Sequence, residues 1–133
     1  MGNEYFAGFF DADGSIGIDG STCYGTVSQV ETSVLDLFYQ RFGGFYQGPY
    51  YSHPNSRPLT RWTVKAHKAK DLFESIYPFL VVKQERCEIA LEYFEWCSGV
   101  NDLRKNKQAD KKIVLAERES CRVRIKELNR RGL

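Results

Sequence analysis

A short segment near the N-terminus changes abruptly from apolar to acidic. Residues 6–14 read FAGFFDADG, so that an apolar run suited to a helix ends in Asp11, Asp13 and Gly14. Glycine commonly follows a helix, whose final carbonyl groups lack intrahelical partners and form the negative end of the helix dipole. An acidic side chain at that end costs roughly 0.3 to 1 kcal/mol. The segment therefore predicts a helix that ends at Gly14 and a group that compensates its carboxylates.

Two β-hairpins are predicted from alternating apolar and polar residues. Residues 14–30 place Ile16 and Ile18 on one face of a strand, before a turn and a second strand. Residues 45–67 alternate around the turn sequence HPNSRP, with Trp62 on the apolar face. The side-chain directions in FYQGPYY stay open, because the two glycines before it leave the strand register undefined.

Helical periodicity separates and follows these hairpins. Residues 32–42 carry apolar side chains three and four apart, with Thr32 or Ser33 as the expected N-cap. Further helices are expected over residues 69–76 and, after an apolar connector, over a segment whose apolar stripe runs from Cys87 to Cys97 and which a Ser-Gly pair ends. The order αββαββαα, followed by a C-terminal arm, predicts an α+β fold with a four-stranded antiparallel sheet, helices on one of its faces and the other face open.

The 133 residues suffice for one core domain, which we place in residues 1–99. Residues 100–133 are expected to form a basic helical C-terminal extension at the periphery, because their apolar stripe is thin. From residue 104 to 131 there are eleven Lys/Arg against four Asp/Glu, although the whole chain carries only +2. This asymmetry favours a polyanionic partner, and a solvated helix face with incidental charge is the alternative.

The composition, with 42% hydrophobic and 27% charged residues, is that of a globular protein. No apolar run is long enough to span a membrane, and no secretory signal precedes the first helix, so we expect an intracellular protein without a membrane partner, its compartment undetermined. Four cysteines form no CxxC pair and lie at no zinc-ligand spacing from the histidines. We expect buried free thiols at Cys23, Cys87, Cys97 and Cys121.

The open face of the predicted sheet combines hydrogen-bonding, cationic and aromatic side chains, which suit contacts with base edges and phosphates. An ordinary hydrated sheet face is the alternative interpretation. The candidate DNA-binding residues are Ser15, Asp19, Tyr24, Thr26 and Ser28 from the first hairpin, with Arg57, Arg61, Thr63 and Lys65 from the second.

Asp11 and Asp13 could belong to several kinds of site. An EF-hand loop that starts at Asp11 would need glycine where Ile16 stands and glutamate where Thr22 stands, so that interpretation fails. Glycosidase carboxylates flank a sugar from separate supports, which one helix end does not supply. A solvated, purely structural pair remains open. The other option is a Mg²⁺ ion held by Asp13, helix-end carbonyl groups and a nucleic-acid phosphate.

The segment FAGFFDADG closely resembles the LAGLIDADG signature of the homing endonucleases, and the order αββαββα resembles that family's domain over about residues 4–97. In this family the signature helices of two domains or two subunits pack together, and the last acidic residue of each lies at a scissile phosphate. The resemblance thus implies that Asp13 binds Mg²⁺, with Mn²⁺ or Ca²⁺ as substitutes, alongside the backbone carbonyl of Ala12. No small-molecule cofactor is expected.

Further roles follow only from the resemblance. VSQ ends in Gln29 where family members place a polar residue near the catalytic water, and PFLVVKQ supplies Lys83 as the basic residue. A surface amide and an exposed lysine are the respective alternatives, and a second basic catalytic residue is not identified. Gly8, Phe9 and Ala12 are the expected helix-contact residues of a dimer, the small ones permitting close approach.

The single copy of the signature implies a homodimer that cuts a roughly palindromic double-stranded DNA site. The leading hypothesis is therefore a Mg²⁺-dependent, site-specific DNA endonuclease that hydrolyses phosphodiesters with catalytic residues Asp13, Gln29 and Lys83. The alternatives are a non-cleaving DNA-binding regulator and an RNA maturase with the same fold. The target sequence, the overhang, and an intron, intein or free-standing origin are not determined by the sequence.

Overall fold

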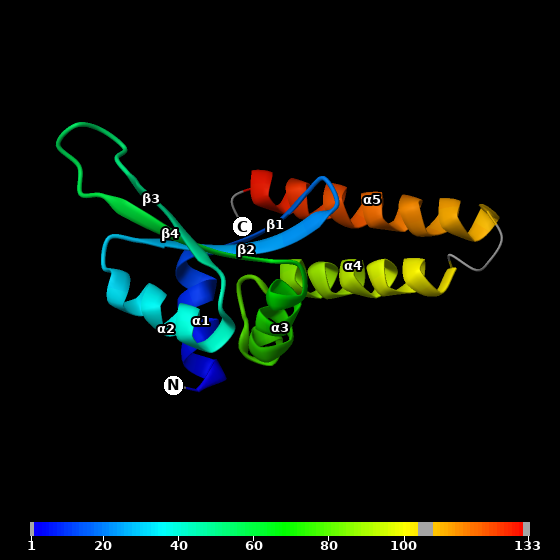
Figure 1. The fold of residues 1–133 in the computed structure, drawn as a ribbon, viewed down its shortest axis with the longest axis horizontal. Helices are drawn as coiled ribbons and strands as arrows, with labels where there is room; N and C mark the ends of the chain where they lie inside the picture. The colour runs from blue at the N-terminus through cyan, green and yellow to red at the C-terminus, as the bar shows by residue number, and fades with distance from the viewer. Residues whose placement is uncertain (1, 104–107, 132–133) are drawn as a thin grey trace.

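The computed structural model describes residues 2–103 and 108–131, and it has the predicted α+β architecture. Figure 1 shows helices α1, α2 and α3 against one face of the sheet, with α4 and α5 side by side at its end. The elements are α1 (Asn3–Asp13), β1 (Gly14–Asp19), β2 (Thr22–Gln29), α2 (Thr32–Phe42), β3 (Phe45–Tyr50), β4 (Leu59–Lys65), α3 (Ala66–Ile76), a 3-10 turn (Tyr77–Phe79), α4 (Gln84–Leu103) and α5 (Gln108–Arg130).

The four strands form one antiparallel sheet in the order β1-β2-β4-β3. Thr26 on β2 pairs with Ser15 on β1 and with Thr63 on β4, whereas the next residue, Val27, pairs with Trp62. Directly paired residues present their side chains on the same face of a sheet. The hydroxyl-bearing row therefore lies on one face, while Val27 and Trp62 are fully buried on the helix-covered face.

Helix α1 is anchored by aromatic packing. Phe6 and Phe10 are buried, with the Phe6 ring 4.9 Å from that of Phe38 and the Phe10 ring 6.2 Å from that of Phe73. The helix ends at Asp13 as predicted, and Gly14 follows with an ordinary φ of −82°. A Cβ atom at Gly14 would lie 2.5 Å from the Phe10 ring, so packing rather than backbone conformation requires glycine there.

Helix α2 differs from the prediction at its N-terminal end only. The N-cap is Glu31, whose carboxylate accepts a 3.2 Å hydrogen bond from the backbone N–H of Ser33, so the expected cap at Thr32 or Ser33 was wrong. Gly43 stops the helix with a φ of +77°, which favours glycine. Its carbonyl accepts a 2.7 Å hydrogen bond from the indole N–H of Trp62, which ties this helix end to β4.

Helix α4 is longer than predicted, because it continues through the Ser-Gly pair to Leu103. The predicted boundary between residues 99 and 100 therefore falls inside a helix. A glycine inside a helix costs about 1 kcal/mol relative to alanine. Helix α4 as a whole packs against α5, and local sequence patterns do not reveal such tertiary contacts.

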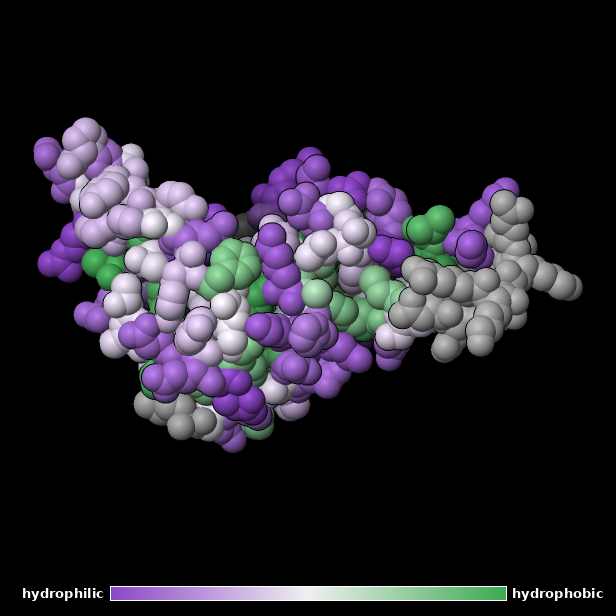
Figure 2. Space-filling view, in the orientation of Figure 1, coloured by the Kyte–Doolittle hydropathy of each residue, from purple (hydrophilic) through white to green (hydrophobic). Residues whose placement is uncertain are grey.

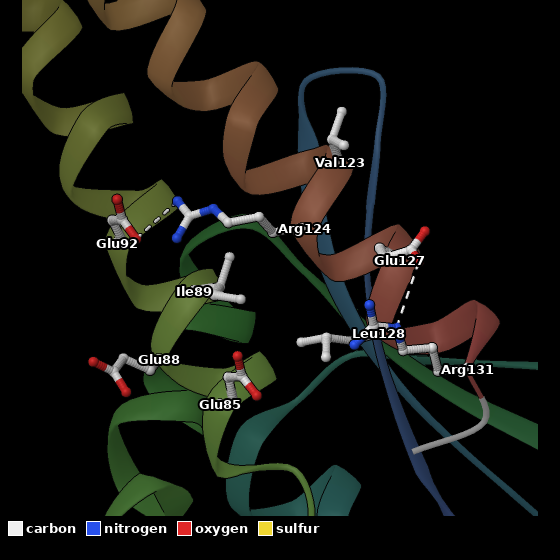
Figure 3. Close-up of a pocket in the computed structure, with 9 residues that line it drawn as sticks. All are labelled: Glu85, Glu88, Ile89, Glu92, Val123, Arg124, Glu127, Leu128 and Arg131. Carbon is white, nitrogen blue, oxygen red and sulfur yellow. Dashed lines mark hydrogen bonds and ion pairs between the residues drawn. The ribbon is translucent and has the colours of Figure 1, made fainter.

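Helix α5 packs along α4 and beside β1 rather than standing apart as a peripheral arm. Cys121 and Ile125 belong to the hydrophobic core, although the apolar stripe of this helix is thin in the sequence. Arg118, which interrupts the stripe, lies 5.5 Å from the Tyr93 ring centroid and donates to its hydroxyl group. An ion pair of 3.0 Å between Arg124 on α5 and Glu92 on α4 also joins the two helices (Figure 3).

All four cysteines are free thiols, as predicted, and three of them are buried; Cys97 is only partly covered. Among the described residues, no helix combines the length and apolarity that a membrane span requires. In the space-filling view, the tip of the β3–β4 hairpin is hydrophilic to near neutral, and a largely hydrophilic surface covers α5 (Figure 2).

Candidate functional site

Asp13 lies at the exposed C-terminal end of α1 and contacts the far end of β2. Its Oδ2 atom accepts a 2.8 Å hydrogen bond from Nε2 of Gln29. The sheet register explains this contact: Gly14 pairs with Val27, so Gln29 is the residue of β2 that extends beyond the start of β1. Two of the three predicted catalytic residues are thereby brought together, although sixteen positions separate them in the chain.

Asp11 is held by the segment that precedes α4. Its two carboxylate oxygens accept hydrogen bonds from the backbone N–H groups of Val81, at 2.7 Å, and Lys83, at 2.9 Å. The ammonium group of Lys83 in turn donates to the backbone carbonyl of Asp11. The compensation that the sequence predicts is therefore supplied to Asp11 by the chain itself, whereas the exposed carboxylate of Asp13 contacts Gln29.

Lys83 occupies a half-buried position between opposing charges. Burial lowers the pKa of its ammonium group, the nearby guanidinium of Arg86 lowers it further, and Asp11 and Asp13 act in the opposite direction. Burial disfavours the charged form because it removes hydrating water. The third predicted catalytic residue thus lies at the same helix end as the other two.

The donor atoms at this end match one part of a Mg²⁺ coordination shell. In residues 2–103 and 108–131, no group of three or more His, Cys, Asp or Glu side chains is placed to hold a metal ion. Asp13 offers one exposed carboxylate, and Ala12 lies in the last helical turn, whose carbonyl groups have no intrahelical partners. One or two carboxylates completed by water and phosphate oxygens is the usual Mg²⁺ arrangement, so these residues fit a site shared with a substrate.

The open face of the sheet forms a polar groove of about 260 Å³. Two cations extend from it: Arg61 lies 5.2 Å from the Tyr50 ring centroid and Lys65 lies 5.7 Å from that of Phe45. The Arg61 Nε–H also donates to the hydroxyl of Ser28 at 3.4 Å. The groove is lined by Asp19, Thr22, Tyr24, Thr26, Gln47, Arg61, Thr63 and Lys65.

Four candidate DNA-binding residues are placed differently from the rest: Thr63 is buried, and Ser15, Ser28 and Arg57 are outside the groove-lining set. Thr63 lies on the predicted face but is only 4% exposed, because it stands on a central strand, and its hydroxyl donates to Oε1 of Gln47. Arg57 lies in the connection between β3 and β4, outside the groove-lining set. Ser15 is exposed on the edge strand β1, in the row of Thr26.

Sequence reasoning missed the contribution of β3. Gln47 lines the groove, and Phe45 and Tyr50 lie under the two cations, whereas no β3 residue was proposed. The register that places them pairs Phe45 with Thr63 and Gln47 with Arg61, followed by an irregularity before Tyr50. The pairing with β4 determines which side chains of β3 lie on the open face of the sheet. In the sequence, only the alternation in β4 indicated this.

The expected dimer-contact residues lie on the side of α1 that turns away from the core. Gly8 and Ala12 are exposed, and a Cβ atom at Gly8 would meet no atom within 4 Å. Phe9 is half-buried, its ring 6.0 Å from that of Phe38. Next to this stripe, in the segment bound by Asp11, Val81 is 82% exposed and Val82 is 61% exposed. Gly8, Ala12, Val81 and Val82 are thus exposed in the single chain.

Comparisons with known proteins identify relatives by structure only. No family model matches the chain, and no curated protein matches it. Among solved structures, the homing endonuclease I-CvuI in complex with the I-CreI target has a TM-score of 0.70 at 19% identity, over 95% of this chain and 80% of that one. The archaeal intron-encoded homing endonuclease I-Vdi141I, complexed with DNA, has a TM-score of 0.71 at 15% identity, over 95% and 82%.

The LAGLIDADG homing endonuclease I-GzeII, in complex with its DNA target, has a TM-score of 0.67 at 16% identity; the match covers 92% of this chain but 44% of that one. TM-scores of 0.67 to 0.71 show a shared fold, and identities of 15 to 19% show no more than that. The shared fold agrees with the FAGFFDADG helix, the antiparallel sheet and the element order of this chain. The chain has the fold of the LAGLIDADG homing endonucleases, which confirms the fold that the resemblance of its sequence implies.

Proposed function

We propose that this protein is a divalent-metal-dependent, site-specific endonuclease that cuts double-stranded DNA. The observation that carries this proposal is the exposed Asp13 carboxylate, oriented by Gln29, at the end of a helix whose other aspartate is already satisfied. A carboxylate that is kept accessible at the negative end of a helix dipole is unfavourable unless a cation binds there. The fold supports the same conclusion, because the similar structures are endonucleases bound to DNA.

The sheet face supports duplex DNA as the substrate. Arg61 and Lys65 supply positive charge for phosphates, while Thr26, Tyr24 and Gln47 supply hydrogen-bonding groups for base edges. Both cations rest on aromatic rings, which restricts the directions in which they reach. Asp19 in the same groove would repel a phosphate but accept a hydrogen bond from cytosine N4, so the face favours some sequences over others.

Asp13 and the carbonyl group of Ala12 would hold the metal ion, and structures of I-CvuI obtained with Mg²⁺ and with Ca²⁺ support this choice of ion. A bound divalent cation supplies Lewis-acid stabilisation of the phosphate and a water of lowered pKa. Gln29 keeps the Asp13 carboxylate in one orientation through their 2.8 Å contact. Lys83, held at the end of α1, would contribute positive charge near the negative charge that develops on the oxygens of the phosphorane.

A homodimer would complete the active site. One chain carries one signature helix, and a double-strand cut needs two acidic helix ends. The exposed stripe of Gly8 and Ala12 suits close approach of two copies of α1, since a second backbone meets no side chain at Gly8. Two-fold symmetry would then match a roughly palindromic target. The match of this chain covers 80 to 82% of I-CvuI and I-Vdi141I but 44% of I-GzeII, so one copy of this chain corresponds to less than half of I-GzeII.

The test is selection of cleaved and bound duplexes from a random pool with Mg²⁺, followed by assays of Asp13→Asn on the selected site. The proposal predicts discrete double-strand cuts by the native protein, with cutting lost and binding in Ca²⁺ retained in the variant. Asp71→Asn, an exposed acid on α3, is the matched control and should cut normally. Cutting by Asp13→Asn would overturn the assignment of Asp13, and tight binding without any cutting would indicate a DNA-binding regulator instead.

A further inference from the structure

One buried cation lies close to the candidate active site without a carboxylate partner. Arg86, in the first turn of α4, is 4% exposed, and none of the ion pairs in the described part of the chain includes it. Within residues 2–103 and 108–131, its Nε–H group has no hydrogen-bond partner. Burying a charged group is costly unless other groups compensate it, so the position of this side chain needs an explanation.

The compensation comes from the C-terminal end of α5. The Arg86 guanidinium donates a 3.1 Å hydrogen bond to the backbone carbonyl of Leu128, in the last turn of that helix. Carbonyl groups there form the negative end of the helix dipole, and a cation at this end is stabilising, most strongly where the site is partly buried. Arg86 therefore fixes the end of α5 against the start of α4.

The same turn of α5 also holds the edge strand of the sheet. The side-chain amide of Asn129 donates a 2.9 Å hydrogen bond to the carbonyl of Ile16 on β1. Strand β1 starts at Gly14, directly after Asp13, and in the part of the chain that the structure describes its outer edge has no neighbouring strand. Figure 1 shows the C-terminal end of α5 beside β1. One helical turn thus contacts both the strand that follows Asp13 and the helix that follows Lys83.

A short chain of contacts links this turn to the predicted catalytic residues. The backbone N–H of Cys87, next to Arg86, donates to the carbonyl of Lys83 at 3.0 Å. The N–H and ammonium groups of Lys83 both bond to Asp11, two residues before Asp13. A shift of the first turn of α4 would therefore move Lys83 relative to the end of α1.

We propose that Arg86 is a positioning residue, which uses the last turn of α5 to hold Lys83 and the end of α1 in their relative places. The role of that geometry in cleavage rests on the proposed function; the positioning itself does not. Helix α5 is in this account a structural support of the candidate active site.

Positioning is tested first by amide hydrogen exchange, which needs no substrate. In Arg86→Met, the N–H groups of Val81 and Lys83, which bond to Asp11, should exchange at least about tenfold faster. The N–H groups of β2 and β4 should keep their rates. Arg86→Lys, which retains a donor to the Leu128 carbonyl, should restore most of the protection. Arg130→Met is the control, because this exposed arginine is one residue from Asn129.

A uniform rise in exchange across the sheet, or no rise at residues 81–83, would overturn the proposal, since either result makes Arg86 a general stability residue or an irrelevant one. Should Arg86→Met fail to fold, Asn129→Ala carries the same test: it removes the contact with β1, and faster exchange must then be confined to β1 and residues 81–83.

On the duplex selected as described above, Arg86→Met should lower the single-turnover cleavage rate at least about tenfold with unchanged DNA affinity in Ca²⁺, and Arg86→Lys should recover it. Unchanged cleavage in Arg86→Met would also overturn the proposal. If the native protein does not cleave at all, the proposed function fails while the hydrogen-exchange result still decides the positioning claim.

Discussion

The two aspartates of the signature helix should respond oppositely to the same substitution. Asp11 accepts two backbone hydrogen bonds, at 2.7 and 2.9 Å, with separate carboxylate oxygens. In Asp11→Asn one oxygen remains, and the new NH₂ group faces a backbone N–H that loses its acceptor. Asp13→Asn instead keeps an oxygen for its single partner, Gln29, and removes a negative charge from the negative end of a helix.

The magnitudes follow from these contacts. A hydrogen bond to a charged group contributes about 1.5 to 3 kcal/mol, and the lower end applies to Asp11 because it is half-exposed. Removing its charge from the helix end returns about 0.3 to 1 kcal/mol. Loss of one bond at that lower end, less the free energy returned by removing the charge, should lower the free energy of unfolding of Asp11→Asn by about 0.5 to 1.2 kcal/mol, equivalent to about 2 to 4 °C in Tm for a chain of this size. Asp13→Asn should be neutral or more stable by up to about 1 kcal/mol.

Thermal and urea unfolding of both variants, at matched protein concentration and without divalent ions, measures this difference. Matched concentration matters because dimerisation would add to the apparent stability. The reasoning would be refuted if Asp11→Asn were as stable as the native protein, or if Asp13→Asn were the less stable of the two. The first result would mean that the Asp11 contacts add nothing, and the second that Asp13 is a structural residue.

Three further outcomes follow from individual contacts. Trp62→Phe removes the 2.7 Å bond to the Gly43 carbonyl and should cost about 1 to 3 kcal/mol in urea unfolding; a neutral result would contradict the role of that bond. Burial and, second, a 2.6 Å hydrogen bond to Asp36 raise the pKa of Tyr46 to about 12. The contribution of Tyr46 to the free energy of unfolding is therefore complete below the ordinary tyrosine pKa near 10, and it is lost as pH rises through about 12. The ultraviolet titration curves of the native protein and of Tyr46→Phe should differ by one tyrosine that ionises at a pH well above 10. Ionisation of Tyr46 near pH 10 would contradict its raised pKa. Of the four thiols, Cys97 should react first with a thiol reagent in the folded protein, as judged by peptide mapping, and the buried three only on unfolding.

Local patterns were sufficient wherever a residue's neighbours in sequence determine its environment. The helix that ends at Asp13, the two hairpins and the buried faces of Ile16 and Trp62 follow from periodicity and glycine positions, and the structure has them as predicted. Helix ends that depend on tertiary contacts were not predictable in this way. Helix α4 continues past its Ser-Gly pair and packs against α5, and no local signal describes that packing.

The residues of the candidate site were predictable from the sequence, but the hydrogen bonds between them were not. The motif identified Asp13, and the resemblance suggested Gln29 and Lys83, which the structure brings to the same helix end. The sequence suggested a cation to compensate both aspartates, whereas Asp11 is compensated by backbone groups seventy positions away. Contacts of that separation depend on the whole fold. The same reason explains why Gln47 on β3 and the buried state of Thr63 were missed.

The most direct test of the central claim is a structure of the protein on its selected duplex in Ca²⁺, which leaves the DNA intact. The account predicts two subunits joined through α1, with both copies of Asp13 at a shared or adjacent cation, about 2.3 to 2.6 Å from it, next to the two scissile phosphates. Arg61, Lys65 and Gln47 should face the DNA groove. A complex in which the end of α1 lies far from every phosphate, with no cation beside Asp13, would contradict it.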